Sequence, residues 1–281
     1  MQGRSDLVSR EKDAVGDRLK TFERAAEVVL DATKPIIVRL DGRAFHTWTH
    51  CLDRPADVRM EALMRRTMLA LAEEVGACYG YTQSDEITLV MLTRGKSQPT
   101  FGARSQKLCS LLASLASVTF NAMLAEYGVV AKKPATFDCR AYNVPDRETA
   151  AEVVLWREAD AIRNSVNARG QEFLSAKQMH ELDIRGVRAW LVENGKAWGD
   201  LTETRKFGSA VARRMQSVPF SSDEIERLPP KHAARTNPAL TVERWVYGTV
   251  ALPLLWTCAN PVEVIFDGAM PIEKQKQKES E

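Results

Sequence analysis

The sequence has little of what would place it in several common protein classes. Its cysteines, Cys51, Cys78, Cys109, Cys139 and Cys258, are far apart and form no C-x-x-C pair, which argues against a disulfide framework and a structural zinc site. This usage fits a reducing compartment, so we expect a cytoplasmic protein. No apolar run approaches the ~20 residues that span a bilayer. The polar segment 1–20 lacks the apolar core of a signal peptide, and we expect no membrane association.

The chain also lacks a strong net charge and any phosphate-binding fingerprint. Lys and Arg number 39 and Asp and Glu 37, so the formal net charge is +2. A surface for nucleic acid would have to be a local patch, because the whole molecule supplies no attractive field. Neither a Walker-type loop nor a G-x-G-x-x-G motif occurs. The 281 residues, 44% of them apolar, suffice for one large domain or two small ones.

Apolar periodicity predicts alternating strands and helices in the first half of the chain. A β-rich run at 36–41 precedes a helix that Asp57 can cap and that reaches about residue 75. Strand-like segments at 78–82 and 87–92 bracket a polar turn, and a helix over about 103–127 leads to a strand over 136–142. This β-α-β-β-α-β order is typical of ferredoxin-like and polymerase-palm domains. We therefore expect an α+β fold, a ferredoxin-like polymerase palm with helical and C-terminal additions.

Two short acidic stretches fall at the ends of predicted strands. Asp41 and Gly42 follow the first strand, whereas Asp85 lies in the hairpin turn of Gln83-Ser84-Asp85-Glu86. In the expected topology these strands are neighbours, so Asp41 and Asp85 should meet. Paired carboxylates can hold two Mg²⁺ ions, and Gly42, without a Cβ, would let its carbonyl approach a metal. Either motif alone could be an ordinary turn, but together in this topology they favour a metal site.

Five motifs in register resemble the tRNA-His guanylyltransferase family. They are RLDGRAFH at 39–46, RPAD at 54–57, QSDE at 83–86, FDCR at 137–140 with Pro145, and WREAD at 156–160. The resemblance covers roughly residues 36–214, and the segments 228–232 and 262–268 look like its bacterial, archaeal and phage "like" branch. It implies an enzyme that adds nucleotides to the 5′ end of tRNA in the 3′–5′ direction, with two Mg²⁺ ions and with ATP and GTP as substrates. A homotetramer or homodimer is implied as well.

The resemblance also implies roles for single residues. Asp41, the Gly42 carbonyl and Asp85 match metal ligands, and Asp41, Asp85 and Glu86 match catalytic carboxylates. The positions that match nucleotide and phosphate contacts are Arg39, Arg43, Ala44, Phe45, His46, Arg54, Asp57, Ser84 and Lys107. The positions that match RNA contacts are Arg104, Asn164, Arg205, Lys206 and Arg213, the last three in a basic segment that we expect to be a loop.

The residues leave some of these roles open. His46 could equally be a capping or core histidine, or face His50 as half of a zinc site, although no third ligand stands at a convincing spacing. We expect Arg104 and Lys107 to add cations near the two aspartates, although they could belong to a solvated helix face, and the basic segment could be a charged hairpin. Arg54 stands where the family has lysine, and it keeps the positive charge for a triphosphate.

One departure from the family pattern bears on the substrate. Ile162 stands where the tRNA-His enzymes have a histidine, so the resemblance implies less dependence on tRNA-His and favours templated 5′-end repair. The alternatives are a dedicated tRNA-His guanylyltransferase, a palm-type nucleotide cyclase and a catalytically silent RNA-binding protein.

Composition and motifs also suggest a division of the chain. We expect a palm domain with an N-terminal extension at 1–145 and a helical segment that contacts tRNA and nucleotide at 146–215. Asp146 and the Ser175–Gln178 capping box should each begin a helix there. A C-terminal segment at 216–270 should pack on the palm, and the charged tail at 271–281 should be disordered.

Overall fold

The computed structural model describes residues 3–53, 57–95, 97–237, 239–249 and 255–274, built around one antiparallel sheet with the strand order β4-β1-β3-β2-β5-β6. The strands are β1 (Ile36–Gly42), β2 (Tyr79–Gln83), β3 (Glu86–Met91), β4 (Phe137–Asn143), β5 (Ser209–Pro219) and β6 (Thr241–Thr249). The longer helices are α1 (Gly3–Ala25), α3 (Val58–Val75), α4 (Ser105–Met123), α5 (Arg147–Gln171) and α7 (Ile184–Glu193). The shorter ones are α2 (Phe45–Trp48), α6 (Ala176–Glu181), α8 (Glu203–Phe207), α9 (Ser222–Arg227) and α10 (Pro261–Asp267).

Strands β1 to β4 with helices α3 and α4 form the expected β-α-β-β-α-β unit, which confirms the predicted fold class. Asp57 caps α3 as predicted, because its carboxylate accepts the Arg59 N–H at 2.9 Å. Helix α4 is shorter than the predicted 103–127. Phe101 and Ala103 have φ angles of 50° and 54°, which prevent an earlier start, and Gly128 at φ 64° closes the turn that follows the helix.

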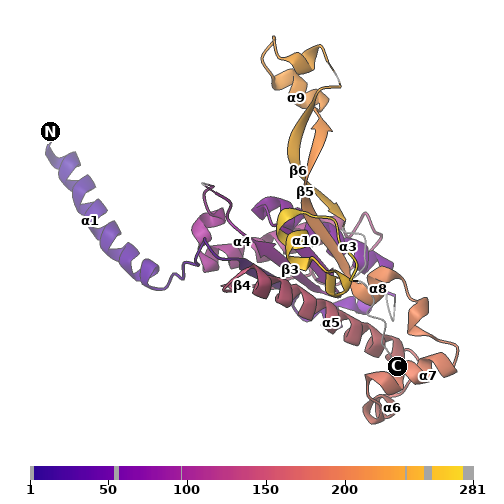
Figure 1. The fold of residues 1–281 in the computed structure, drawn as a ribbon. Coiled ribbons are helices and arrows are strands. Elements are labelled where there is room, and N and C mark those ends of the chain that lie inside the picture. Colours follow the sequence, from indigo (N-terminus) through magenta and orange to yellow (C-terminus); the bar gives the residue numbers. More distant parts are fainter. Residues whose placement is uncertain (1–2, 54–56, 96, 238, 250–254, 275–281) are drawn as a thin grey trace.

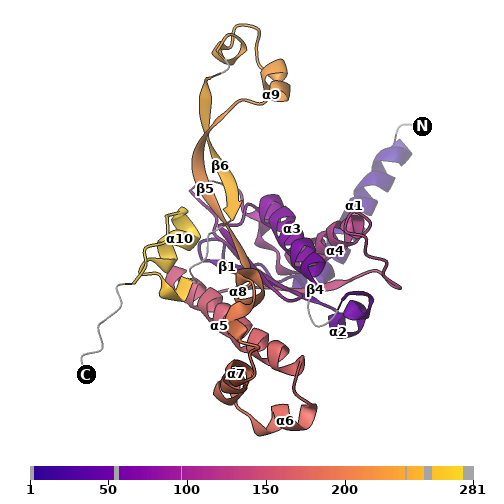
Figure 2. The same cartoon turned by 90° about the vertical axis from the view of Figure 1, so that its right-hand side faces the viewer.

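Helices cover both faces of the sheet (Figure 2). Successive side chains of a strand point to opposite faces, and β1 divides accordingly. Val38 and Leu40 pack in the core cluster that contains the buried faces of α3 and α4, whereas Ile37 packs in the cluster of α5 and α10. Arg39 and Asp41 share the strand face of Ile37. They therefore lie on the side of the sheet that α5 covers.

The helical segment after β4 contains the predicted caps. Asp146 accepts the Thr149 N–H at the start of α5, and Ser175 and Gln178 form a complete capping box on α6. The predicted basic loop at 205–214 is wrong, because these residues form α8 and the first half of β5. Thr202 caps α8, and Gly208 at φ 77° ends it, since a Cβ there would lie 2.4 Å from the Thr82 carbonyl oxygen.

Strands β5 and β6 form a ribbon that projects from the sheet and carries α9 near its tip (Figure 1). Residues 209–212 of β5 pair with β2, and the Arg213 N–H still donates to the Cys78 carbonyl oxygen, whereas 214–219 pair with β6 alone. Within the expected C-terminal segment 216–270, α10 contacts α5 and β5, whereas the ribbon extends away from the sheet. The proposed boundary at 215/216 falls inside β5. In the expected tail at 271–281, residues 272–274 form backbone hydrogen bonds and a β-bridge with residues 257–259. Residues 275–281 lie outside the described residues.

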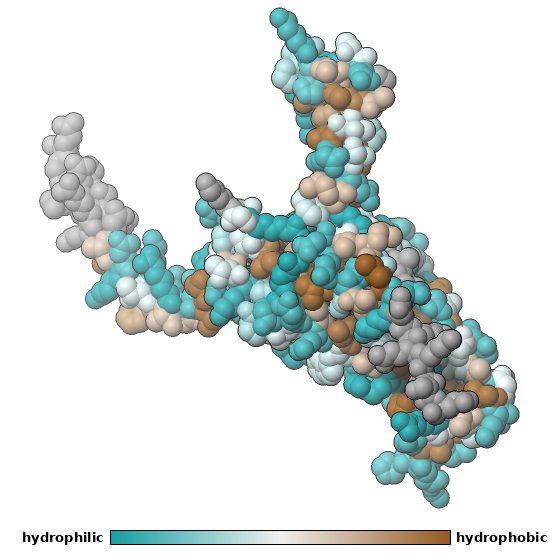
Figure 3. All heavy atoms as spheres, in the orientation of Figure 1, coloured by the Kyte–Doolittle hydropathy of each residue, from teal (hydrophilic) through white to brown (hydrophobic). Residues whose placement is uncertain are grey.

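Helix α1 extends away from the sheet (Figure 1), and its side chains Val15, Leu19 and Phe22 are exposed. Polar residues dominate the face drawn in Figure 3, with apolar residues in small groups. Among the described residues, none of the helices combines the length and the apolar character that a membrane crossing requires.

Candidate active site

Asp41 and Asp85 meet at one end of the sheet, as the topology predicted. Asp41 is the last residue but one of β1, and Asp85 lies in the two-residue turn between β2 and β3, where Ser84 has a φ of 55°. The Gly42 N–H donates to the Asp85 carbonyl oxygen at 3.0 Å, which holds the turn against the end of β1. Two carboxylates from separate elements therefore face one region.

The environment of Asp85 disfavours its charged form. Burial raises the pKa of the Asp85 carboxyl above its ordinary value, and the charge of Asp41 raises it further. The hydroxyl of Ser84, which donates to Asp85 Oδ1 at 3.1 Å, and the backbone act in the opposite direction without cancelling the shift. A cation between Asp41 and Asp85 would offset this effect, because it would stabilise the charged form of both carboxylates.

Replacing Asp85 by asparagine is expected to stabilise the fold at neutral pH in the absence of divalent ions. An acid whose pKa is raised in the fold contributes stability below its unfolded pKa near 3.8, and that stability is lost as pH rises through the folded value. Asp85→Asn should thus have a Tm a few degrees higher than wild type at pH 7 and an equal Tm near pH 3. Thermal unfolding at both pH values is the measurement. A lower Tm for the variant at pH 7 would contradict the raised pKa of Asp85.

Glu86 is held by two arginines. Arg39 Nε lies 2.8 Å from Oε2 and Arg157 Nε lies 2.7 Å from Oε1, and all three side chains are largely buried. Burial raises the pKa of Glu86, while the two guanidinium groups act to lower it. In this arrangement Glu86 supports the strand ends through ion pairs, and Arg39, which we expected at the phosphates, has its charge compensated by Glu86.

The sequence reasoning did not assign a role to Arg157 or Asp160. Arg157 bridges Glu86 to Asp160, with Nη2 to Oδ2 at 2.9 Å, and Asp160 also pairs with Arg163 at 2.8 Å. The amide of Asn164 donates to Asp160 at 3.4 Å. The WREAD motif was the available signal, since it places Arg157 and Asp160 one helical turn apart. This chain of charges connects β1 and β3 to α5.

The segment after β1 lies beside the two aspartates and rests on an aromatic cluster. Phe45 is buried and packs on Trp48, with ring centroids 5.1 Å apart, and on Phe137, also at 5.1 Å. Ala44 is in the left-handed region, with φ 54° and ψ 34°. Arg43, Ala44 and His46 are exposed, so the side chains of Arg43 and His46 can reach a ligand, whereas that of Phe45 cannot.

Gly42→Ala is expected to destabilise the fold by about 1–3 kcal/mol, as overpacking does. A Cβ at residue 42 would lie 2.3 Å from the Phe45 ring, so glycine at this position leaves the space that the ring occupies. Gly16→Ala in α1, where nothing lies within 4 Å, is the control and should not destabilise. Urea unfolding measures both. Equal stability of Gly42→Ala and wild type would show that the Phe45 ring is free to move.

The remaining nucleotide positions are spread over the palm. Ser84 is exposed at the hairpin turn, beside Asp85. Asp57 is saturated as a cap by backbone N–H groups and by Arg59, which lowers its pKa to about 2. Arg54 lies outside the described residues. Lys107, near the start of α4, has its Nζ 5.9 Å from the centre of the Phe101 ring.

The structure does not bring Arg104 and Lys107 to the end of the sheet that holds Asp41. The start of α4 lies beside β4 at Ala141, whose carbonyl accepts the Ser105 hydroxyl, whereas it is Phe137 of β4 that pairs with Gly42. Arg104 forms an ion pair with Glu27 at 3.2 Å. Our expectation that these cations lie near the aspartates is therefore wrong.

The basic residues after α7 are largely compensated. Arg205 forms an ion pair with Glu172, and Lys206 is buried and pairs with Glu203 at 2.6 Å. Arg213 lies further along β5, with its guanidinium over the Trp245 ring at 4.9 Å. Of the proposed RNA contacts, Asn164 is exposed on α5 and the closest to the charge chain of Glu86.

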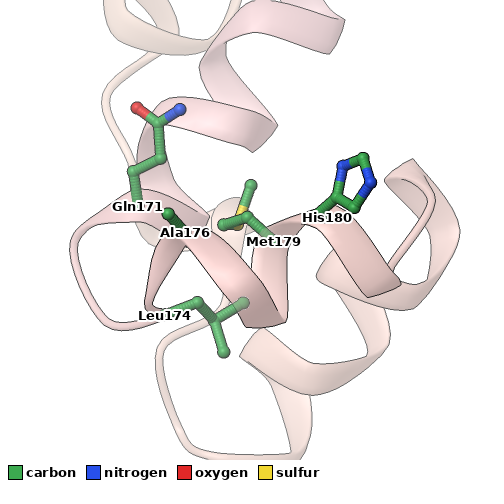
Figure 4. Close-up of a pocket in the computed structure, with 5 residues that line it drawn as sticks. All are labelled: Gln171, Leu174, Ala176, Met179 and His180. Atoms are coloured by element: carbon green, nitrogen blue, oxygen red, sulfur yellow. The ribbon is translucent and has the colours of Figure 1, made fainter.

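The larger of two described hollows lies away from the aspartates. It has a volume of about 490 Å³ and is formed by the end of α5 and by α6 (Figure 4), with the lining residues Gln171, Leu174, Ala176, Met179 and His180. None of the predicted site residues lines it. The aspartates instead lie at the end of β1 and in the turn between β2 and β3.

Comparison with known proteins gives consistent matches. A sequence model of the family described as Thg1, tRNAHis guanylyltransferase, matches residues 16–145. A probable tRNA(His) guanylyltransferase of Dictyostelium discoideum is 34% identical over 136 residues, which are 47% of this chain and 52% of that protein. The match thus spans about half the length of that curated relative.

Two solved structures of bacterial tRNA(His) guanylyltransferase (Thg1)-like proteins resemble the whole fold. One, in complex with ATP, has a TM-score of 0.72 and 29% identity, covering 90% of this chain and 98% of its own. The other, in complex with GTP, has a TM-score of 0.63 and 27% identity, covering 86% and 94%. The similarity therefore extends beyond residues 16–145 to most of the chain.

Proposed function

Because residues 16–145 of this chain belong to the tRNAHis guanylyltransferase family, a family of nucleotidyltransferases, we propose that it adds nucleotides to the 5′ end of a tRNA in the 3′–5′ direction and requires Mg²⁺. The observation that carries the proposal is the meeting of Asp41 and Asp85 across the Gly42–Asp85 hydrogen bond. Two neighbouring, half-buried carboxylates at a strand end are costly for a fold unless a cation lies between them.

The donor set at this strand end suits magnesium. The two carboxylates and the Gly42 carbonyl offer oxygen only, which hard cations prefer. The described residues contain no group of three His, Cys, Asp or Glu side chains able to hold a metal. Mg²⁺ is commonly held by one or two carboxylates and completed by water and substrate phosphates, so this sparse set fits it. When bound, such ions would neutralise phosphate charge and favour ionisation of the attacking hydroxyl.

The chain's own residues would bind and orient the substrates. Arg43 and His46, exposed beside Asp41, would contact the triphosphate of ATP or GTP, the nucleotides bound by the two bacterial neighbours. Glu86, fixed by Arg39 and Arg157, would keep β1 and β3 in register so that Asp41 and Asp85 hold their separation. Asn164 and Asp160 on α5 would face the RNA.

The wider proposal concerns assembly and location. The exposed apolar side chains of α1, and Leu111 and Val118 on the outer face of α4, support a homodimer or homotetramer in which they are covered. Cys51, Cys78, Cys109 and Cys139 are free thiols in the described part of the chain, which supports a cytoplasmic protein.

Product analysis tests this function. The protein, Mg²⁺ and labelled nucleoside triphosphates are incubated with tRNA that lacks its first nucleotide, and the products are separated by thin-layer chromatography. We expect pyrophosphate in proportion to nucleotide joined, and no cyclic nucleotide when RNA is omitted. Cyclic product from GTP alone would instead assign a nucleotide cyclase.

A further inference from the structure

A second hollow lies at the opposite end of the sheet from Asp41 and Asp85. It measures about 300 Å³ and is bounded by the end of β3 with the loop that follows, by Gly76 at the end of α3, and by the base of the ribbon. Five residue steps of β3, from Glu86 to Met91, separate the two ends by roughly 17 Å at about 3.3 Å per residue. A ligand here would not touch the aspartates.

Two arginines line this hollow, Arg94 from the loop after β3 and Arg213 from β5. The Arg94 guanidinium lies 4.3 Å from the centre of the Trp245 ring, and that of Arg213 lies 4.9 Å from the same ring. Arg94 also donates to the Phe266 carbonyl, which fixes it to α10. Arg–aromatic contacts hold the guanidinium planes while leaving N–H groups at their edges free to donate. The two cations are therefore pre-oriented.

The charges of the hollow are uncompensated. No Asp or Glu lines it, and neither Arg94 nor Arg213 forms an ion pair within the described part of the chain. Arg213 Nε is buried and has no hydrogen-bond acceptor among the described residues. The charge of Glu73 on α3 raises the pKa of Tyr247, the register partner of Arg213, but Glu73 does not line the hollow. An unmet buried donor destabilises a fold, so an acceptor from outside would stabilise the site.

We propose that this hollow binds the phosphate group of a nucleotide, either within an RNA strand or in a free nucleotide. Paired guanidinium groups match phosphate oxygens in geometry and charge. Thr93, Ser97 and Gln98 add polar side chains to the lining, and the volume leaves room for the attached sugar. The case in which the phosphate belongs to an RNA strand rests on the proposed function, since it supposes a tRNA whose 5′ end lies at Asp41 and Asp85.

Ser97→Glu is the main test, because Ser97 is exposed and its substitution places a negative charge in the hollow without disturbing a buried group. Ser97→Gln is the matched neutral control. Arg213→Gln removes one cation, and Arg65→Gln removes an exposed cation of α3 that lines neither hollow. Circular dichroism first verifies that each variant is folded.

The RNA arm measures fluorescence anisotropy of labelled tRNA lacking its first nucleotide, over a range of salt concentrations. We expect Ser97→Glu and Arg213→Gln to weaken binding about tenfold and to reduce the slope of log K against log salt by roughly 0.7, the value for one phosphate contact on a single strand. Both controls should match wild type.

The free-ligand arm titrates inorganic phosphate by calorimetry. If RNA affinity is unchanged but phosphate binding is lost in Ser97→Glu and Arg213→Gln alone, the ligand is a free nucleotide or phosphate. If neither arm responds to these variants, the inference is overturned. Should wild type bind RNA in an Arg213-dependent way yet add no nucleotide, the proposed function fails while the phosphate site stands.

Discussion

Asp41→Ala and Asp85→Ala are each expected to lower the single-turnover rate of nucleotide addition at least a hundredfold, a loss of about 2.7 kcal/mol of transition-state stabilisation. Each change removes one of two carboxylates that meet at the end of β1, leaving too few oxygen ligands for a cation that must neutralise a triphosphate. Rapid-quench assays with saturating tRNA and nucleotide measure the rate. Folding of each variant is verified by circular dichroism.

Asp138→Ala is the matched control for these variants. Asp138 pairs with Asp41 in the sheet register, on the neighbouring strand β4, and its carboxylate forms only a long contact of 3.7 Å with Arg140. The same loss of charge next to the site should change the rate by no more than about threefold. A folded Asp41 or Asp85 variant with more than a tenth of the wild-type rate would refute the metal assignment.

The choice of tRNA is the second large effect. Ile162 on α5 cannot make the polar contact of the histidine found in tRNA-His-specific enzymes, so we expect no strong preference for the tRNA-His anticodon. Truncated acceptor stems whose opposite strand can pair with the incoming base should be preferred instead. The measurement is kcat/KM on truncated tRNA-His and on truncated non-His tRNAs, each with matched and mismatched nucleotide.

Two outcomes would contradict templated repair. One is a hundredfold preference for tRNA-His, about 2.7 kcal/mol, and the other is indifference to the template base. Either would identify a dedicated guanylyltransferase. The Ile162→His variant serves as a control, since it should acquire selectivity only if this position contacts the anticodon.

The meeting of Asp41 and Asp85 was predictable because it depends only on topology. Apolar alternation located the strands, and the β-α-β-β-α-β order determined which ends are neighbours. The same reasoning could not find the partners of Glu86. They depend on how α5 crosses the sheet and turns Arg157 inward, and this is decided by packing over the whole α5 face.

The segment after α7 was misread because its residues carry two opposing signals. The cationic side chains of Arg205, Lys206 and Arg213 suggested a loop, but Thr202 caps a helix and the apolar residues 210–212 pair with β2. Sequence alone also placed Arg104 near Asp41, because it located the helix but not the end of the sheet at which that helix begins. The compensation of Arg205 by Glu172 likewise arises only from a tertiary contact, whereas Lys206 pairs with Glu203 within α8.

The projecting ribbon implies that the molecule opens in stages. Beyond residue 213 its two strands have no third strand beside them, and a two-stranded hairpin by itself is only marginally stable in water. Its backbone amides should therefore exchange hydrogen through local opening, at a free energy well below that of β1, which is paired on both sides. Unfolding of the tip and unfolding of the central strands are then separate events, so the ribbon can fluctuate while the strand ends that hold Asp41 and Asp85 stay in place.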